Sequence, residues 1–216
     1  MSDAAGARAV LQIDPRGTSW ALVPHTADAA RRAEWPEEIL SALAARWGVT
    51  GQRAAELAPE AVVRAMIEAD PGGVLAEVVD WPVPGEWPIR VSFSLAAPGG
   101  GRDLRARGYA AAPCTSAALG AGTQYTRRSP TEEVGREDAL DGVVVFDRGD
   151  ATLVARIHPA PLAVYLQAAP ALAALLDTVR LTDAAGRDFS VSDPGAVTVA
   201  NSDLWAVEDA SGGADD

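Results

Sequence analysis

The segment Ile89–Ala96, with the sequence IRVSFSLA, decides the fold class because its side chains alternate between apolar and polar. The apolar phase holds Ile89, Val91, Phe93 and Leu95, and the polar phase holds Arg90, Ser92 and Ser94. A period of two is typical of a β-strand with one buried face. We predict a strand here, preceded by another over Val74–Asp80 across a connection rich in Pro, Gly and Trp at Trp81–Pro88.

Two turns predict antiparallel hairpins on either side of this segment. Asp14–Gly17 separates strand-like runs at Ala9–Ile13 and Thr18–Val23, and its Pro and Gly suit a type I turn followed by a positive φ. Asp147–Asp150 separates Val143–Phe146 from Thr152–Ile157 in the same way. Weaker strands are predicted within 104–125, at Phe189–Val191 and at Ala196–Val199.

Helices are predicted where apolar residues recur every three or four positions. One begins at Trp35-Pro36-Glu37-Glu38, with Pro36 at the first helical position, and ends at Gly48. A second runs from Pro59 to Ala69, and a third covers Pro161–Val179, where Pro170 predicts a kink or a break. Because the helices come in clusters, the predicted class is α+β: a mainly antiparallel sheet with helices packed against it.

The 216 residues are predicted to form a single α+β domain over 1–202 and an acidic, disordered tail over 203–216. The tail has five acids and no basic residue. We expect one contiguous core, built from residues on the apolar phase of each element. These are Trp20, Ile39, Leu43, Trp47, Val91, Phe93, Val144, Phe146, Val154, Leu172, Leu176 and Val179.

Composition excludes several functions. All 18 basic residues are Arg, so no phosphate-binding G-x-x-x-x-G-K-[ST] loop and no Schiff-base lysine is present. The net charge of −12 disfavours nucleic acid and anionic membranes as partners. The N-terminal sequence does not resemble a signal peptide, and no stretch approaches the length of a transmembrane segment, so we expect a cytoplasmic protein.

Few side chains are candidates for chemistry. His25 and His158 each follow a predicted strand, so both could lie at one sheet edge and share a metal or acid/base site; the preferred interpretation is two separate loop residues with satisfied hydrogen bonds. Cys114 is expected to be a partly buried thiol. Gly120–Tyr125 begins like a dinucleotide-binding fingerprint but has Tyr125 in place of the third Gly. We therefore predict no cofactor.

The tail contains a possible partner contact formed by Leu204, Trp205 and Val207 within acidic sequence. As a linear motif, this segment would place Trp205 in a pocket of another protein. As a closing strand, it would pack against this protein's own sheet. The strand interpretation is preferred because Val197–Val199 lies just upstream.

A resemblance adds to these expectations. Thr123-Gln124-Tyr125, the hairpin Gly142–Ile157 and the helix ending at Leu175–Leu181 resemble the C-terminal half of a group of uncharacterised actinobacterial α+β proteins with a predicted PsbP-like architecture. The helix at Trp35-Pro36-Glu37, after an opening hairpin, is similar to their N-terminal half. The resemblance implies a protein-binding or accessory role.

The sequence therefore predicts a non-enzymatic protein that binds another protein. The alternative is a small-molecule-binding domain or a hydrolytic enzyme, with a pocket between helix and sheet and His25 or His158 as base. A deep pocket with either histidine beside a carboxylate would favour the enzyme, and a flat apolar or acidic patch would favour the protein-binding role.

Overall fold

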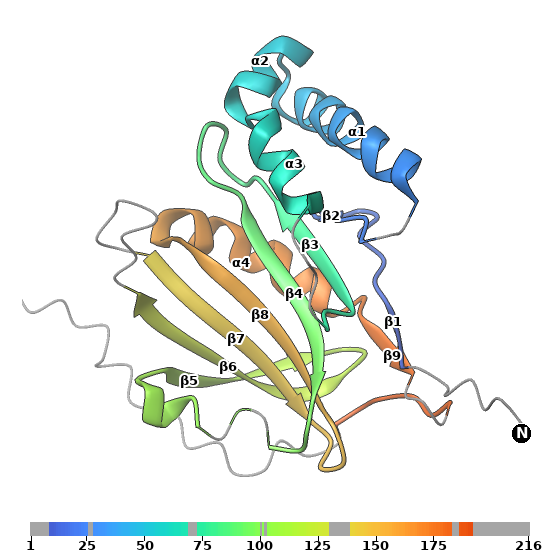
Figure 1. The fold of residues 1–216 in the computed structure, drawn as a ribbon. Helices are drawn as coiled ribbons and strands as arrows, with labels where there is room; N and C mark the ends of the chain where they lie inside the picture. The colour runs from blue at the N-terminus through green and yellow to red at the C-terminus, as the bar shows by residue number, and fades with distance from the viewer. Residues whose placement is uncertain are drawn as a thin grey trace, which may run out of the picture.

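A computed structural model describes residues 9–25, 28–68, 73–99, 101, 103–129, 139–182 and 186–191. Within them, a seven-stranded antiparallel sheet is the largest unit (Figure 1). Its strands are β2 (Ala21–Leu22), β3 (Ala76–Asp80), β4 (Ile89–Ala96), β5 (Ala110–Ser116), β6 (Gly120–Ser129), β7 (Ala139–Asp147) and β8 (Thr152–Pro161), in the spatial order β2-β3-β4-β8-β7-β6-β5. The described helices are α1 (Ala29–Trp47), α2 (Gly51–Leu57), α3 (Glu60–Glu68) and α4 (Leu162–Leu176). This arrangement confirms the α+β class.

Strand β4 confirms the prediction made from alternation. It lies inside the sheet, where it pairs with β3 on one side and β8 on the other. Ile89, Val91 and Phe93 are fully buried, whereas Arg90 and Ser94 on the opposite phase remain partly exposed. The predicted hairpin at Asp147–Asp150 is also confirmed, as β7 and β8.

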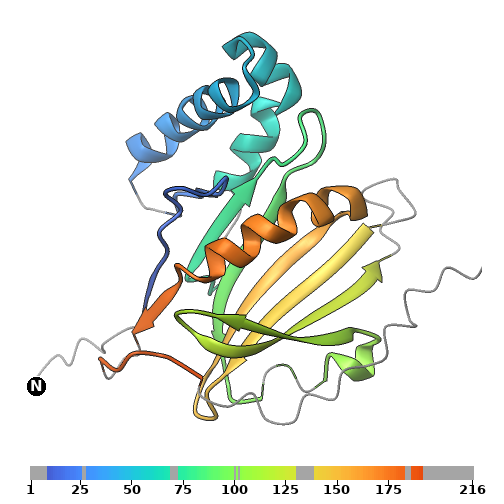
Figure 2. The same cartoon turned by 180° about the vertical axis from the view of Figure 1, so that it is seen from behind.

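Helix α4 covers the face of the sheet that carries these apolar side chains (Figure 2). Its buried residues include Tyr165, Leu172 and Leu176. Pro170 lies inside one assigned helix, rather than breaking it as one prediction allowed. The reason is positional: Pro170 and Leu166, whose carbonyl loses its i+4 donor, are both exposed, so water can satisfy that carbonyl.

The other face carries a helical unit at the β2–β3 end. Three helices occur here rather than the predicted two, and α1 begins seven residues before Pro36. Asp28 caps this earlier start, because its carboxylate accepts from the backbone N–H groups of Ala30 and Arg31. Pro36 is therefore a buried interior residue, not the first helical one. Gly48 ends the helix with a φ of 65°, as predicted.

The predicted hairpin at the N-terminus is wrong. The turn forms, since Thr18 N donates to Pro15 O at 3.0 Å and Gly17 has a φ of 81°. Its flanking strands nevertheless pair elsewhere: β1 (Val10–Gln12) joins β9 (Arg180–Thr182) in a separate two-stranded sheet, and β2 joins β3. The local turn is correct, but distant strands decide the pairing.

The predicted single core is divided into three clusters. The largest lies between α4 and the sheet, a second lies under α1 and α3 around Trp35 and Trp81, and a third lies on the opposite sheet face around Leu104 and Tyr109. Of the predicted residues, Ile39, Leu43 and the partly buried Trp47 belong to the second cluster, and the partly buried Val154 packs on the third. The sheet separates the largest cluster from the other two, because alternate side chains leave its two faces.

Some predictions fall outside the described residues: the strand at Ala196–Val199, and the tail 203–216 with Leu204, Trp205 and Val207. Phe189–Val191 forms no strand in the structure, although an isolated bridge joins Val191 to Gly120. None of the helices in the described ranges combines the length and apolar character needed to cross a membrane.

Candidate functional site

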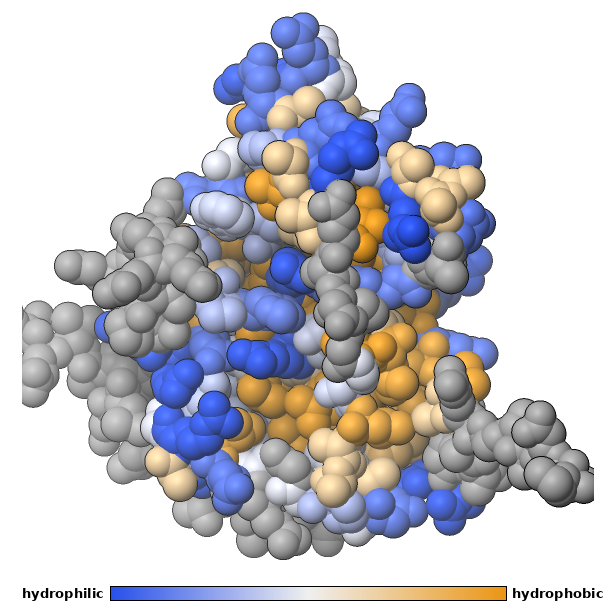
Figure 3. All heavy atoms as spheres, viewed as in Figure 1, coloured by the Kyte–Doolittle hydropathy of each residue, from blue (hydrophilic) through white to orange (hydrophobic). Residues whose placement is uncertain are grey.

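Polar side chains gather on the sheet face opposite α4. Val78 and Val91 are directly paired and face α4, and Val91 is paired with Ile157 on its other side. Their neighbours along each strand therefore point to the opposite face, which places Glu77, Arg90, Ser92 and His158 together. Figure 3 views the molecule from this side and shows hydrophilic side chains, in blue, next to apolar surface in orange.

Glu77 joins Arg90 and His25 across this face. Its Oε2 lies 2.8 Å from His25 Nε2, and its Oε1 accepts from Arg90 Nε at 2.5 Å. The Glu77 side chain is 5% exposed, that of His25 11% and that of Arg90 28%. Both carboxylate oxygens are therefore engaged. The carboxylate fixes the Arg90 guanidinium on β4 relative to the segment that follows β2.

His158 lies inside β8, not after its end as predicted. Its Nε2 is 3.2 Å from the hydroxyl oxygen of Ser92 on the neighbouring strand. Burial lowers the pKa of His158 below its ordinary value of 6.5, and the positive charge of Arg90 lowers it further, with partial opposition from Glu77. The imidazole is consequently neutral near pH 7.

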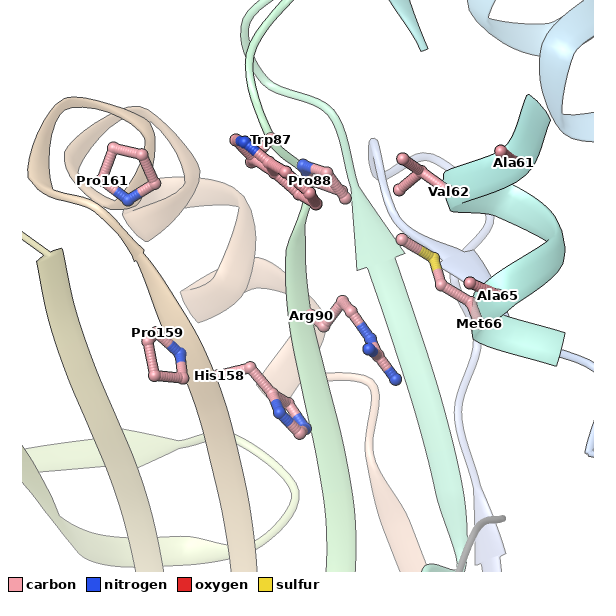
Figure 4. Close-up of a pocket in the computed structure, with 10 residues that line it drawn as sticks. All are labelled: Ala61, Val62, Ala65, Met66, Trp87, Pro88, Arg90, His158, Pro159 and Pro161. Carbon is pink, nitrogen blue, oxygen red and sulfur yellow. The ribbon is translucent and has the colours of Figure 1, made fainter. Parts of the chain in front are cut away.

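A pocket of about 510 Å³ opens beside these groups, between α3, the connection from β3 to β4, and the end of β8 (Figure 4). It is lined by Ala61, Val62, Ala65, Met66, Trp87, Pro88, Arg90, His158, Pro159 and Pro161. Trp87 is 54% exposed. Three of the lining residues are prolines, which have no backbone N–H, and the side-chain N–H donors of the lining belong to Trp87, Arg90 and His158.

Local structure explains why the pocket stays open. The β3–β4 connection is held on the helical unit by a hydrogen bond from Gly85 N to Leu57 O at 3.2 Å, and Gly85 has a φ of 81°. Val63 and Met66 attach α3 to the second cluster. Each wall is therefore anchored in a packed region of the protein, and the space between the walls is not filled.

The structure brings the two predicted histidines to the same face without direct contact. His25 lies on one side of Glu77, and His158 lies beyond Arg90, which the sequence analysis did not single out. Only His158 lines the pocket. Within the described ranges, no group of three or more His, Cys, Asp or Glu side chains is placed to hold a metal ion.

The other described residues singled out from the sequence as candidates for chemistry lie on strands of the sheet, away from the pocket. Cys114 on β5 is partly buried, as predicted, and burial raises the pKa of its thiol to about 11. Gly122 of the glycine-rich segment lies on β6, where a Cβ atom would be 2.7 Å from the Phe146 ring. Outside the pocket, the buried carboxylate of Asp141 accepts hydrogen bonds from Tyr109 and Arg127.

Comparison with known proteins gives no relative. The chain matches no protein-family model, and neither the curated proteins nor the solved structures provide a match. The resemblance to the PsbP-like architecture stays a prediction.

Proposed function

We propose that this protein binds a small organic molecule in the pocket between α3 and the sheet. The pocket itself carries the proposal: its volume of about 510 Å³ falls within the range of roughly 300–1,000 Å³ typical of small-molecule sites. Its composition is also that of such sites, with apolar walls and a few polar groups at one place. A small-molecule-binding domain of this kind, with a pocket between helix and sheet, is the sequence-based alternative to a protein-binding role.

Binding is favoured over hydrolysis by the position of the polar groups. Ser92 carries a hydroxyl hydrogen-bonded to His158, but this residue is 8% exposed and does not line the pocket. His25 has the carboxylate partner that a general base needs, yet it lies outside the lining as well. A molecule in the pocket therefore meets Arg90 and the neutral His158, and no nucleophile activated by either histidine.

The protein-binding or accessory role also remains a proposal. The resemblance given in the sequence analysis implies this role, and its possible partner contact, formed by Leu204, Trp205 and Val207, lies outside the described residues. Deleting Asp203–Asp216 tests it: loss of a partner at an unchanged melting temperature supports the linear motif, and a clear fall in the melting temperature of the isolated protein contradicts it.

Titration with N-phenyl-1-naphthylamine, a neutral apolar fluorophore, tests the pocket. We expect saturable fluorescence enhancement in the wild type, with energy transfer from Trp87 that Trp87→Phe reduces. Ala65→Phe should weaken binding at least about tenfold, because the added ring occupies the pocket. Ala45→Phe is the matched control, since it adds the same ring to an exposed position of α1 outside the pocket. No saturable binding, or equal binding by both variants, overturns the proposal.

A further inference from the structure

We propose that the ligand is an organic acid, with its carboxylate on Arg90 and its hydrocarbon part between α3 and Trp87. This inference rests on the proposed binding function and specifies the chemistry of the ligand. It follows from the charge of the lining, the free donors of Arg90 and the apolar walls.

The lining differs in charge from the rest of the molecule. The chain has a net charge of −12, yet the described residues that line the pocket include an arginine and a histidine and no acid. Glu77, the carboxylate that contacts Arg90, lies outside the lining, and both its oxygens are engaged with Arg90 and His25. An anionic group in the pocket thus meets donors, and no acidic lining residue repels it.

Arg90 keeps donors for such a group. A guanidinium carries five N–H donors, and Glu77 engages Nε and Nη2 through the single oxygen Oε1. Among the described residues no protein partner engages Nη1. Because Glu77 fixes one edge of the guanidinium, Arg90 loses little conformational freedom when a ligand binds its other edge.

The shape of the pocket separates the two ends of the ligand. Figure 4 shows Arg90 and His158 side by side on neighbouring strands, with the apolar side chains of α3 on one side and Trp87 and Pro88 above. A carboxylate at Arg90 leaves an attached chain against Met66, Val62 and Trp87. Transfer of that chain from water to the apolar walls strengthens binding with each CH₂ group that the pocket buries.

Octanoate and octanol, which differ in the charged head, test the inference by displacement of N-phenyl-1-naphthylamine. We expect octanoate to bind at least about tenfold more tightly than octanol, as one charge-assisted hydrogen bond in a partly buried site allows. Arg90→Gln should remove this preference, because it weakens octanoate binding much more than octanol binding. Arg156→Gln is the matched control, because Arg156 is an exposed arginine of β8 outside the lining, and it should retain the preference.

The double variant Glu77→Gln/Arg90→Gln removes the carboxylate and the guanidinium of this pair together, and it keeps the test valid if Arg90→Gln does not fold. Equal affinities for octanoate and octanol, or an equal loss of both in the Arg90 variants, overturn the organic-acid inference while the pocket still binds. Failure of the neutral fluorophore to bind at all overturns the proposed function instead.

Discussion

Replacing Glu77 by Ala should destabilise the protein by about 3 kcal/mol. Removing one member of a buried ion pair typically costs about 3–5 kcal/mol, because the remaining charge is left without its partner. The cost should be near the lower limit, since the side chains of Arg90 and His25 are 28% and 11% exposed and water can reach them in part. Urea unfolding followed by tryptophan fluorescence measures the free energy of unfolding.

Two further variants identify the cause. Glu56→Ala removes a carboxylate that pairs with Arg53 on the surface, where both side chains are more than half exposed, and it should change the free energy by less than about 0.5 kcal/mol. The double variant Glu77→Ala/Arg90→Met should recover part of the loss, because it no longer leaves the guanidinium unpaired. A cost of Glu77→Ala below about 1 kcal/mol, or no recovery in the double variant, refutes the reasoning.

Further expectations concern the core, the sheet and two titrating groups. Leu176→Ala should cost about 2–5 kcal/mol in urea unfolding, because Leu176 is buried under the sheet; a cost below about 0.5 kcal/mol contradicts its placement. Gly122→Ala should cost about 1–3 kcal/mol, since the new Cβ meets the Phe146 ring. Stability should fall as the pH drops below 6.5, because unfolded His158 takes up a proton there while the lowered pKa keeps the folded form neutral; His158→Gln should flatten this part of the pH profile. Iodoacetamide should modify Cys114 far more slowly in the folded protein at pH 8 than in urea, since the folded thiol has a pKa of about 11.

The sequence predicts elements best where one segment contains all the information. The alternation in Ile89–Ala96 requires no knowledge of its neighbours, and the turn at Asp147–Asp150 joins strands that pair with each other. Asp14–Gly17 has equally good turn chemistry but joins strands whose partners lie far away in the chain. Register and partner choice are tertiary properties, so turn residues alone cannot predict them.

The start of α1 shows a different error. Pro36 suits a first helical position, but Asp28 is also a good N-cap, and the helix it begins extends through the proline. Propensity at one residue is a weak guide when a better cap lies upstream.

The site was only partly visible in the sequence. His158 is identified simply because histidine is rare in this chain, and Arg90 and Glu77 are visible as charges within apolar strands. Their meeting depends on the pairing of Glu77 with Ser92 and on the place of β8 beside β4. Trp87 gave no signal of its own, because its exposure at the pocket depends on how α3 packs.

The strand order has a consequence for the time course of folding. β2, β3 and β4 form one ladder of successive strands and β5 to β8 form another, and the two ladders meet only where β4 pairs with β8. This junction joins segments about sixty residues apart, so closing it has a large entropic cost and should come late in folding. The pocket spans the junction, with α3 and Arg90 on one side and His158 and Pro159 on the other. A bound ligand therefore ties the two ladders together, and its binding energy should slow their separation more than it speeds their assembly.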